Sequence, residues 1–179
     1  MEHEKYVIAL KKIALAYLLI TFDINIGTLH IIPKWVGYYM FYHYLDDIAY
    51  YEKSASLLKS TALILMGYEG LLWLLALFNI QSNNYVITVI FASIGLYFHF
   101  QLLTNLVDIA YRHGSTFTSV LKNIRTVRTI MITLLALPME INQIISVVIA
   151  VLGCIIEIYL CIVLNNYAKE EAKGLCWVT

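Results

Sequence analysis

Long apolar stretches separated by short polar breaks restrict the fold of this chain more than any other feature. Residues 58–80, 85–111 and 141–167 are predominantly apolar, and each is long enough to cross the roughly 30 Å hydrocarbon core of a bilayer as a helix. Backbone groups in lipid must be hydrogen-bonded within the segment, which favours helices. Apolar residues make up 61% of the chain and charged residues only 13%. This pattern predicts an all-α, polytopic membrane helical bundle.

Polar turns and a proline divide the chain into about six helical segments. The prediction treats all 179 residues as a single integral membrane domain, without an internal repeat or a soluble domain. Pro33 is placed at the start of the second helix, because its missing N–H costs nothing in a first turn. The expected segments are 8–32 (with a break), 33–52, 58–80, 85–111, 117–137 and 141–167.

The first segment is interrupted by polar and helix-breaking residues at Asp23, Asn25 and Gly27. These residues favour local turns over a continuous helix. If Lys12 marks one membrane face, Asp23 lies about 15 Å deeper, near the bilayer centre. The sequence then predicts a broken helix, interrupted between Asp23 and Thr28.

The charges of the first segment also allow a second interpretation. In it the span begins near Tyr6, and the Lys11 and Lys12 side chains extend to the interface while their stems stay in the apolar region. Asp23 then lies at the outer edge of the membrane. The sequence leaves both interpretations open.

Basic residues are shared unevenly between the two ends of the expected helices. Lys34 alone lies at an outer end, and the other eleven of the twelve Lys and Arg residues lie toward the other side. By the positive-inside rule, this predicts six spans with both termini in the cytoplasm. The fifth segment has only nine residues between Arg128 and Pro138. It can cross only if Lys122, Arg125 and Arg128 lie in the inner leaflet.

Polar side chains at mid-membrane depth are candidates for a functional site, because burying them in lipid is costly. We predict that Glu69 and Glu157 face the interior of the bundle and that at least one of them is neutral at pH 7. The full candidate set for proton or ligand binding is Asp23, Asn25, His43, Asp47, Glu69, His99 and Glu157.

Helical spacing tests which of these residues can share a site. His43 and Asp47 lie on one stripe of the second segment, four residues apart. On the fourth segment, His99 lies about 180° away from Asp108 and shares its face with Gly95. Whether His99 belongs to the central set therefore stays open.

A second candidate feature is an ionic belt in the inner leaflet. Arg125 and Arg128 share one helix face, and Asp46, Asp47 and Asp108 fall near the cytoplasmic ends of the second and fourth segments. Because each set alone would leave charges without partners, we predict that the two sets pair and hold the cytoplasmic side closed. In the alternative, all of these charges project into the cytoplasm and head groups.

Metal and nucleotide chemistry have little support in the sequence. His43, His99, Glu69 and Glu157, with Cys154 or Cys161, could be metal ligands, but no tight ligand motif is present. The simpler interpretation of the two cysteines is small apolar packing. No P-loop, Rossmann or G-x-S-x-G pattern occurs. We therefore predict no cofactor and no metal, and the balanced charge argues against a nucleic-acid partner.

The run Asp23-Ile-Asn25-Ile-Gly27, followed by Leu29-x-x-x-Pro33-x-x-Val36-Gly37-Tyr38, resembles the opening motif of a group of uncharacterised small multi-pass membrane proteins from Gram-positive bacteria. The resemblance covers about residues 13–60 and implies a bacterial plasma-membrane location, with no activity. In size and number of spans the chain is also similar to the substrate-binding subunits of energy-coupling-factor vitamin transporters. It lacks their glycine-rich loop, so that similarity is at the level of fold alone.

Three hypotheses about function follow. In the first, the protein is a small transporter, or the substrate-binding membrane subunit of one, for a small molecule or an ion. In the second, it is a regulatory or assembly subunit whose polar stripes bind a membrane protein partner. The third, an intramembrane metalloenzyme, ranks last. The lipid bilayer is the one partner common to all three.

Overall fold

Six long helices make up most of the described part of the chain. The computed structural model describes residues 2–21, 25–26, 29–30, 33–80, 84–136 and 143–174. The elements are α1 (Glu2–Thr21), β1 (Asn25–Ile26), β2 (Leu29–His30), α2 (Lys34–Ala49), the 3-10 helix η1 (Lys53–Leu57), α3 (Leu58–Leu77), α4 (Tyr85–Arg112), α5 (Thr118–Ala136) and α6 (Gln143–Gly174).

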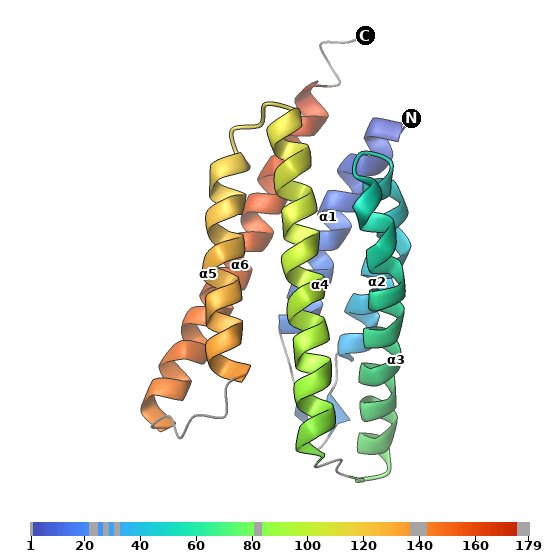
Figure 1. The fold of residues 1–179 in the computed structure, drawn as a ribbon, viewed down its shortest axis with the longest axis vertical. Helices are drawn as coiled ribbons and strands as arrows, with labels where there is room; N and C mark the ends of the chain where they lie inside the picture. Colours follow the sequence, from blue (N-terminus) through green and yellow to red (C-terminus); the bar gives the residue numbers. More distant parts are fainter. Residues whose placement is uncertain are drawn as a thin grey trace.

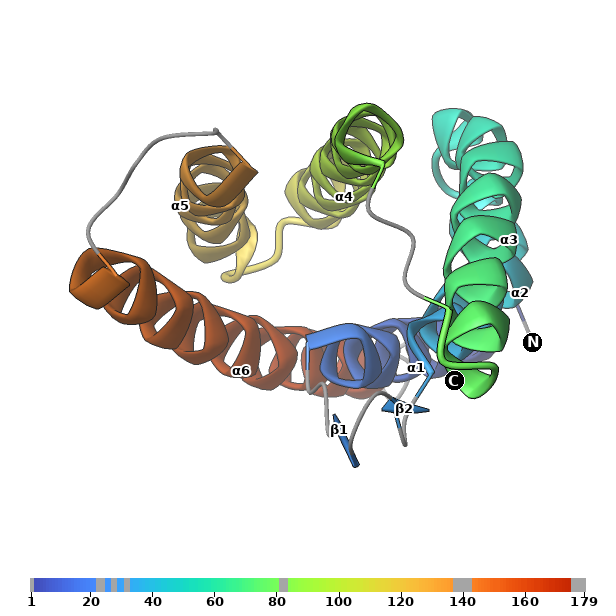
Figure 2. The same ribbon diagram turned by 90° about the horizontal axis from the view of Figure 1, so that it is seen from below.

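The helices form a ring in chain order. Each helix packs against the helix before it and the helix after it, and α6 closes the ring by packing against α1 (Figures 1 and 2). Consecutive helices run in opposite directions. The start of α1 therefore lies at the same end of the bundle as the last residues of α2, α4 and α6 (Figure 1). We call this the polar end, and the opposite one the apolar end.

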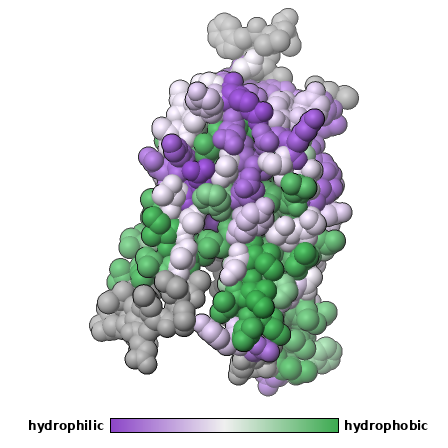
Figure 3. Space-filling view, in the orientation of Figure 1, coloured by the Kyte–Doolittle hydropathy of each residue, from purple (hydrophilic) through white to green (hydrophobic). Residues whose placement is uncertain are grey.

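Side-chain polarity changes along the length of the ring. Hydrophilic side chains gather at the polar end, and hydrophobic side chains cover much of the remaining length (Figure 3). Within the described residues, the helices at Lys53–Leu77, Tyr85–Arg112 and Val147–Gly174 are long and apolar enough to cross a membrane. α2 is shorter, with 16 residues, and both α1 and α5 carry several charged side chains along their length.

The first helix differs from the expected broken span. α1 begins at Glu2, earlier than the expected Ile8, and it is continuous to Thr21. The polar stretch follows the helix instead of lying within it: Asn25–Ile26 pairs antiparallel with Leu29–His30. These bounds agree better with a span that begins near Tyr6. Pro33 directly precedes α2 as its N-cap residue, close to its predicted place at the start of that helix.

α1 packs between α2 and α6 and forms much of the core. Tyr6, Leu10 and Ile13 are fully buried. The Cys161 thiol of α6 donates to the carbonyl oxygen of Ala14 at 3.2 Å, so this cysteine has a packing role. α2 approaches α1 closely at Gly37, where an added Cβ would lie 2.5 Å from Ile20 Cγ1 and 3.0 Å from the carbonyl oxygen of Ala16. A small residue is therefore needed at this crossing.

A cluster of histidine, tyrosine and glutamate side chains ties the helices together at the polar end. The Glu171 carboxylate of α6 accepts a hydrogen bond from His113 Nδ1 at 3.0 Å, and its Oε2 lies 3.3 Å from His3 Nε2 of α1. His3 Nδ1 is 3.3 Å from the Tyr51 hydroxyl. Burial raises the pKa of Tyr51 above its usual value, so its hydroxyl remains protonated and forms a hydrogen bond with His3. One carboxylate thus joins α1, α6 and the turn after α4.

Replacing Glu171 by glutamine is expected to destabilise this end of the ring. The amide loses the negative charge that lies between His113 and His3 and keeps only one acceptor oxygen, so the free energy of unfolding should fall by about 1 kcal/mol. Thermal unfolding in detergent measures the change. Glu4→Gln, at an exposed position of α1, is the matched control and should have no effect; an equal loss in both variants would contradict the assignment.

Candidate functional site

A cavity of about 560 Å³ lies inside the ring, and side chains from all six helices line it. Small residues create the space: Ala92 and Gly95 on α4, and Ala150 and Gly153 on α6, face it without filling it. The lining includes the last residue of α1, the first residue of α2 and Thr88 in the first turn of α4. The cavity therefore extends from the apolar end toward the middle of the bundle, and its volume suits a small organic molecule.

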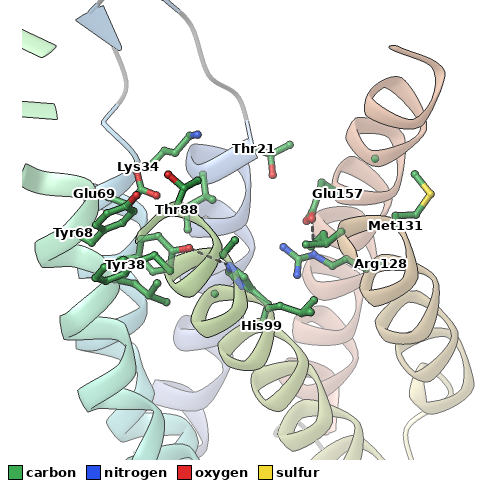
Figure 4. A pocket seen from close by; sticks show the side chains of 18 of the residues that line it. Thr21, Lys34, Tyr38, Tyr68, Glu69, Thr88, His99, Arg128, Met131 and Glu157 are labelled. Atoms are coloured by element: carbon green, nitrogen blue, oxygen red, sulfur yellow. Dashed lines mark hydrogen bonds and ion pairs between the residues drawn. The ribbon is translucent and has the colours of Figure 1, made fainter. Parts of the chain in front are cut away.

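The inner wall of the cavity carries a buried ion pair. Arg128 Nε on α5 donates to Glu157 Oε1 on α6, and the two residues are only 6% and 7% exposed (Figure 4). The guanidinium also lies over the Tyr17 ring, 5.1 Å from its centroid, an arrangement that favours the cation. The other carboxylate oxygen, Glu157 Oε2, is buried and has no hydrogen-bond partner among the described residues.

His99 on α4 lies near the ion pair. Its Nε2 is 3.4 Å from the hydroxyl of Tyr38 on α2, and both side chains line the cavity (Figure 4). Its Nδ1 is buried without a partner in the described part of the chain. Phe41 and Phe98 pack against the imidazole, with ring centroids 5.8 and 5.1 Å away. The site therefore has a buried imidazole nitrogen that makes no hydrogen bond to the described residues.

A second pair of charged residues lines the cavity nearer the apolar end. Lys34 at the start of α2 and Glu69 on α3 lie on one side of the close-up view, and Arg128 and Glu157 lie on the other (Figure 4). Trp73 of α3 adds an aromatic wall, 6.4 Å from the Trp35 ring centroid. The cavity thus has two basic and two acidic side chains, embedded in a largely apolar lining.

The structure brings together three residues of the predicted central set. Glu69, His99 and Glu157 all line the cavity, which places His99 with the two glutamates. Asp23 lies outside the described residues, as does the Asn25 side chain. Their proposed role therefore stays a prediction.

His43 and Asp47 do not belong to the cavity lining. His43 is exposed and stacks on Tyr39, with ring centroids 6.4 Å apart. Asp47 is half-buried and lies one helical turn further toward the polar end. Both lie on one stripe, as predicted, but α2 directs that stripe away from the interior because Tyr38, Phe41 and Leu45 occupy the inward face.

In the described part of the chain the predicted ionic belt does not form, because several of its residues have other partners. Asp46 pairs with Lys59 of α3 at 2.7 Å, and Arg128 pairs with Glu157. Arg125 donates to the Thr104 hydroxyl of α4 at 3.1 Å. The ring order explains the difference, since α5 packs between α4 and α6 and does not reach α2.

Asp108 and Asp47 take no part in such a belt either. Asp108 is exposed, and its backbone carbonyl oxygen accepts from Arg112 Nε at 3.3 Å. Among the described residues, no recorded salt bridge joins either aspartate to α5.

Arg128 was predicted to belong to the ionic belt, but in the structure it pairs with Glu157 at the cavity. The positions of Arg128 and Glu157 along their segments could have predicted this pair. Arg128 lies ten residues before Pro138 and Glu157 lies sixteen residues after Ile141, so both fall well inside their segments. The two segments are consecutive and antiparallel, which places such residues side by side. Lys34 and Tyr38 were missed because they resemble ordinary interfacial anchors.

The described part of the chain contains no group of three or more His, Cys, Asp or Glu side chains placed to hold a metal ion. The candidate ligands are separated: His43 is exposed, the Cys161 thiol is hydrogen-bonded to the carbonyl oxygen of Ala14, and Glu157 is paired with Arg128. The geometry of the described residues therefore gives the metal hypothesis no support.

Comparisons with known proteins leave the cavity as the basis for the functional argument. The chain matches no protein-family model, no curated protein and no solved structure.

Proposed function

We propose that the protein is a six-span membrane protein, with both termini in the cytoplasm, that binds a small organic molecule in its central cavity. It would act as a small transporter or as the substrate-binding membrane subunit of one. The observation that carries this proposal is the 560 Å³ cavity, lined by all six helices, with a buried ion pair and a buried histidine on its wall.

The chemistry of the cavity supports a ligand-binding role. Buried charges give no clear gain in stability over apolar packing of the same volume, so a protein that needed only a stable bundle would have little use for them. Charged and ionisable groups inside membrane proteins commonly mark the path of a substrate or an ion. A mainly apolar pocket with a few converging polar groups is the usual form of a small-molecule site.

The orientation of the cavity supports access from outside the cell. Basic residues gather at the polar end, which the positive-inside rule assigns to the cytoplasm. The cavity reaches the apolar end, at the start of α2 and α4. There α4 and α5 diverge (Figures 1 and 2).

Cysteine labelling tests this orientation. In a chain without its three native cysteines, Thr88→Cys should react with a membrane-impermeant maleimide in intact cells, because position 88 lines the outer part of the cavity. Ser56→Cys, at an exposed position of η1 near the polar end, should react only after permeabilisation. Reaction of Ser56→Cys in intact cells would overturn the orientation, and failure of Thr88→Cys to react in either condition would show a cavity closed to water.

A further inference from the structure

We propose that the ligand is an organic anion with an apolar body and that it binds together with one proton, which Glu157 receives. This inference rests on the proposed function of the cavity and names the chemical class of the ligand. Its evidence lies in the composition of the cavity walls and in two groups without hydrogen-bond partners among the described residues, the distal nitrogens of Arg128 and Oε2 of Glu157.

Arg128 is poised to bind an anion. Its recorded hydrogen bond to Glu157 uses Nε, while a guanidinium has five N–H donors in a planar fork. The residue lines the cavity, and its guanidinium points toward the cavity from the α5 side (Figure 4). The distal nitrogens make no recorded hydrogen bond to described residues. A buried, planar guanidinium with donors available on its distal nitrogens is suited to bind a carboxylate, phosphate or sulfonate group.

The remaining walls select the rest of the ligand. Leu65, Leu72, Phe91 and Ile132 line the cavity with apolar surface, and burying apolar ligand surface against such walls is favourable. A ligand whose charged group reaches Arg128 would lie along these side chains toward the apolar end. The structure therefore favours an amphipathic organic anion over an inorganic ion.

The buried ion pair makes a proton part of the binding reaction. Arg128 and Glu157 are neutral as a pair, so an added anion would bring a second negative charge to one guanidinium in a poorly solvated site. Glu157 Oε2, which is buried without a partner in the described residues, can relieve this by taking a proton from solvent. The titratable groups that surround Glu157 or line the same cavity are Arg128 on α5, Tyr17 on α1, Lys34 and Tyr38 on α2, Tyr68 and Glu69 on α3, His99 on α4, and Cys154 and Cys161 on α6.

The first arm of the test measures charge preference. Purified, delipidated protein in an uncharged detergent is titrated calorimetrically with hexanesulfonate, hexanamide and hexylammonium. The sulfonate stays ionised at all working pH values, and it should bind at least tenfold more tightly than the amide or the amine. Arg128→Lys keeps the charge but loses the fork, and it should weaken sulfonate binding about tenfold. Arg125→Lys, one turn away and outside the cavity lining, is the matched control and should bind as wild type does.

The second arm measures the proton. If one proton enters with each anion, the dissociation constant for hexanesulfonate should rise about tenfold for each unit of increasing pH. Glu157→Gln mimics the protonated carboxyl, so this variant should bind the sulfonate with no dependence on pH. A wild-type affinity that does not change with pH, or a dependence that persists in Glu157→Gln, would overturn the coupling.

The outcomes separate this inference from the proposed function. If Thr88→Cys reacts from outside but the sulfonate fails to bind, or binds no better than the amide or the amine, the anion site is wrong and the cavity assignment stands. If Thr88→Cys does not react and no probe binds, both are wrong. Mass spectrometry of the protein before delipidation identifies the source of the anion: a co-purified acidic lipid that is lost in Arg128→Lys points to a lipid head group, and its absence to a free anion.

Discussion

Arg128→Met is expected to lower the free energy of unfolding by about 3–5 kcal/mol, because it leaves the Glu157 carboxylate buried without its cation. The reason is the burial of the pair, since both residues are under one-tenth exposed. In a protein of this length such a loss corresponds to a fall of roughly 10 °C in Tm. Thermal unfolding of the purified protein in detergent, followed by circular dichroism, measures it.

Two further variants isolate the cause. Adding Glu157→Leu to Arg128→Met removes both charges and should recover most of the lost stability, because an apolar pair of similar volume can replace a buried ion pair. Asp46→Asn breaks the ion pair with Lys59. The Asp46 side chain is 64% exposed and that of Lys59 27%, so this change should lower the free energy of unfolding by less than about 1 kcal/mol. An equal cost in Asp46→Asn and Arg128→Met would contradict the argument, and so would a double variant as unstable as the single one.

Gly37→Ala is expected to have the second largest effect, a loss of about 1–3 kcal/mol through overpacking. The new methyl group would meet Ile20 Cγ1 at 2.5 Å and the backbone oxygen of Ala16 at 3.0 Å. The Ile20 side chain can rotate, but the Ala16 oxygen moves only if the whole of α1 shifts. The expected result is a lower Tm and weaker α1–α2 packing.

The same substitution at another glycine provides the control. At Gly67 of α3, an added Cβ has no atom within 4 Å. Alanine is favoured over glycine in a helix by up to about 1 kcal/mol, so Gly67→Ala should be neutral or stabilising. If the two variants change Tm in the same direction and by the same amount, the close crossing at Gly37 is not limiting.

Local sequence signals predicted the helices but not their neighbours. The polar breaks at 52–56, 81–84 and 113–115 and the positions of Pro33 and Pro138 were enough to divide the chain into six segments that correspond to the helices of the structure. Apolar length identified the strongest candidate spans, which include α3, α4 and α6. These features depend on residues close in sequence, so no knowledge of packing was needed.

Which charged residues pair depends on which helices pack together, and this could not be predicted from local sequence signals. Asp46 and Arg125 have suitable charge and depth, yet they lie on helices that do not touch, because α5 is flanked by α4 and α6. Depth correctly placed Glu69 and Glu157 at the cavity, but it left His99 undecided and wrongly included His43, since depth does not say which way a side chain faces. Which helix lies beside which is a property of the whole ring, and one sequence carries no direct signal of it.

The closure of α6 on α1 has a consequence for how the chain is put together. In the ring every helix borders its neighbours in sequence except at one seam, where α1 and α6 meet and where Glu171 lies beside His3. Of the six described helices α1 is made first, yet the face that carries Tyr6 and Ala14 acquires its partners, Tyr167 and Cys161, last. The five earlier interfaces can form one after another as the ribosome adds each helix, whereas the seam joins the first and the last of these six helices. A covalent link across it, with new ends opened in the turn between α4 and α5, would keep every helix contact and change only the order in which they are made.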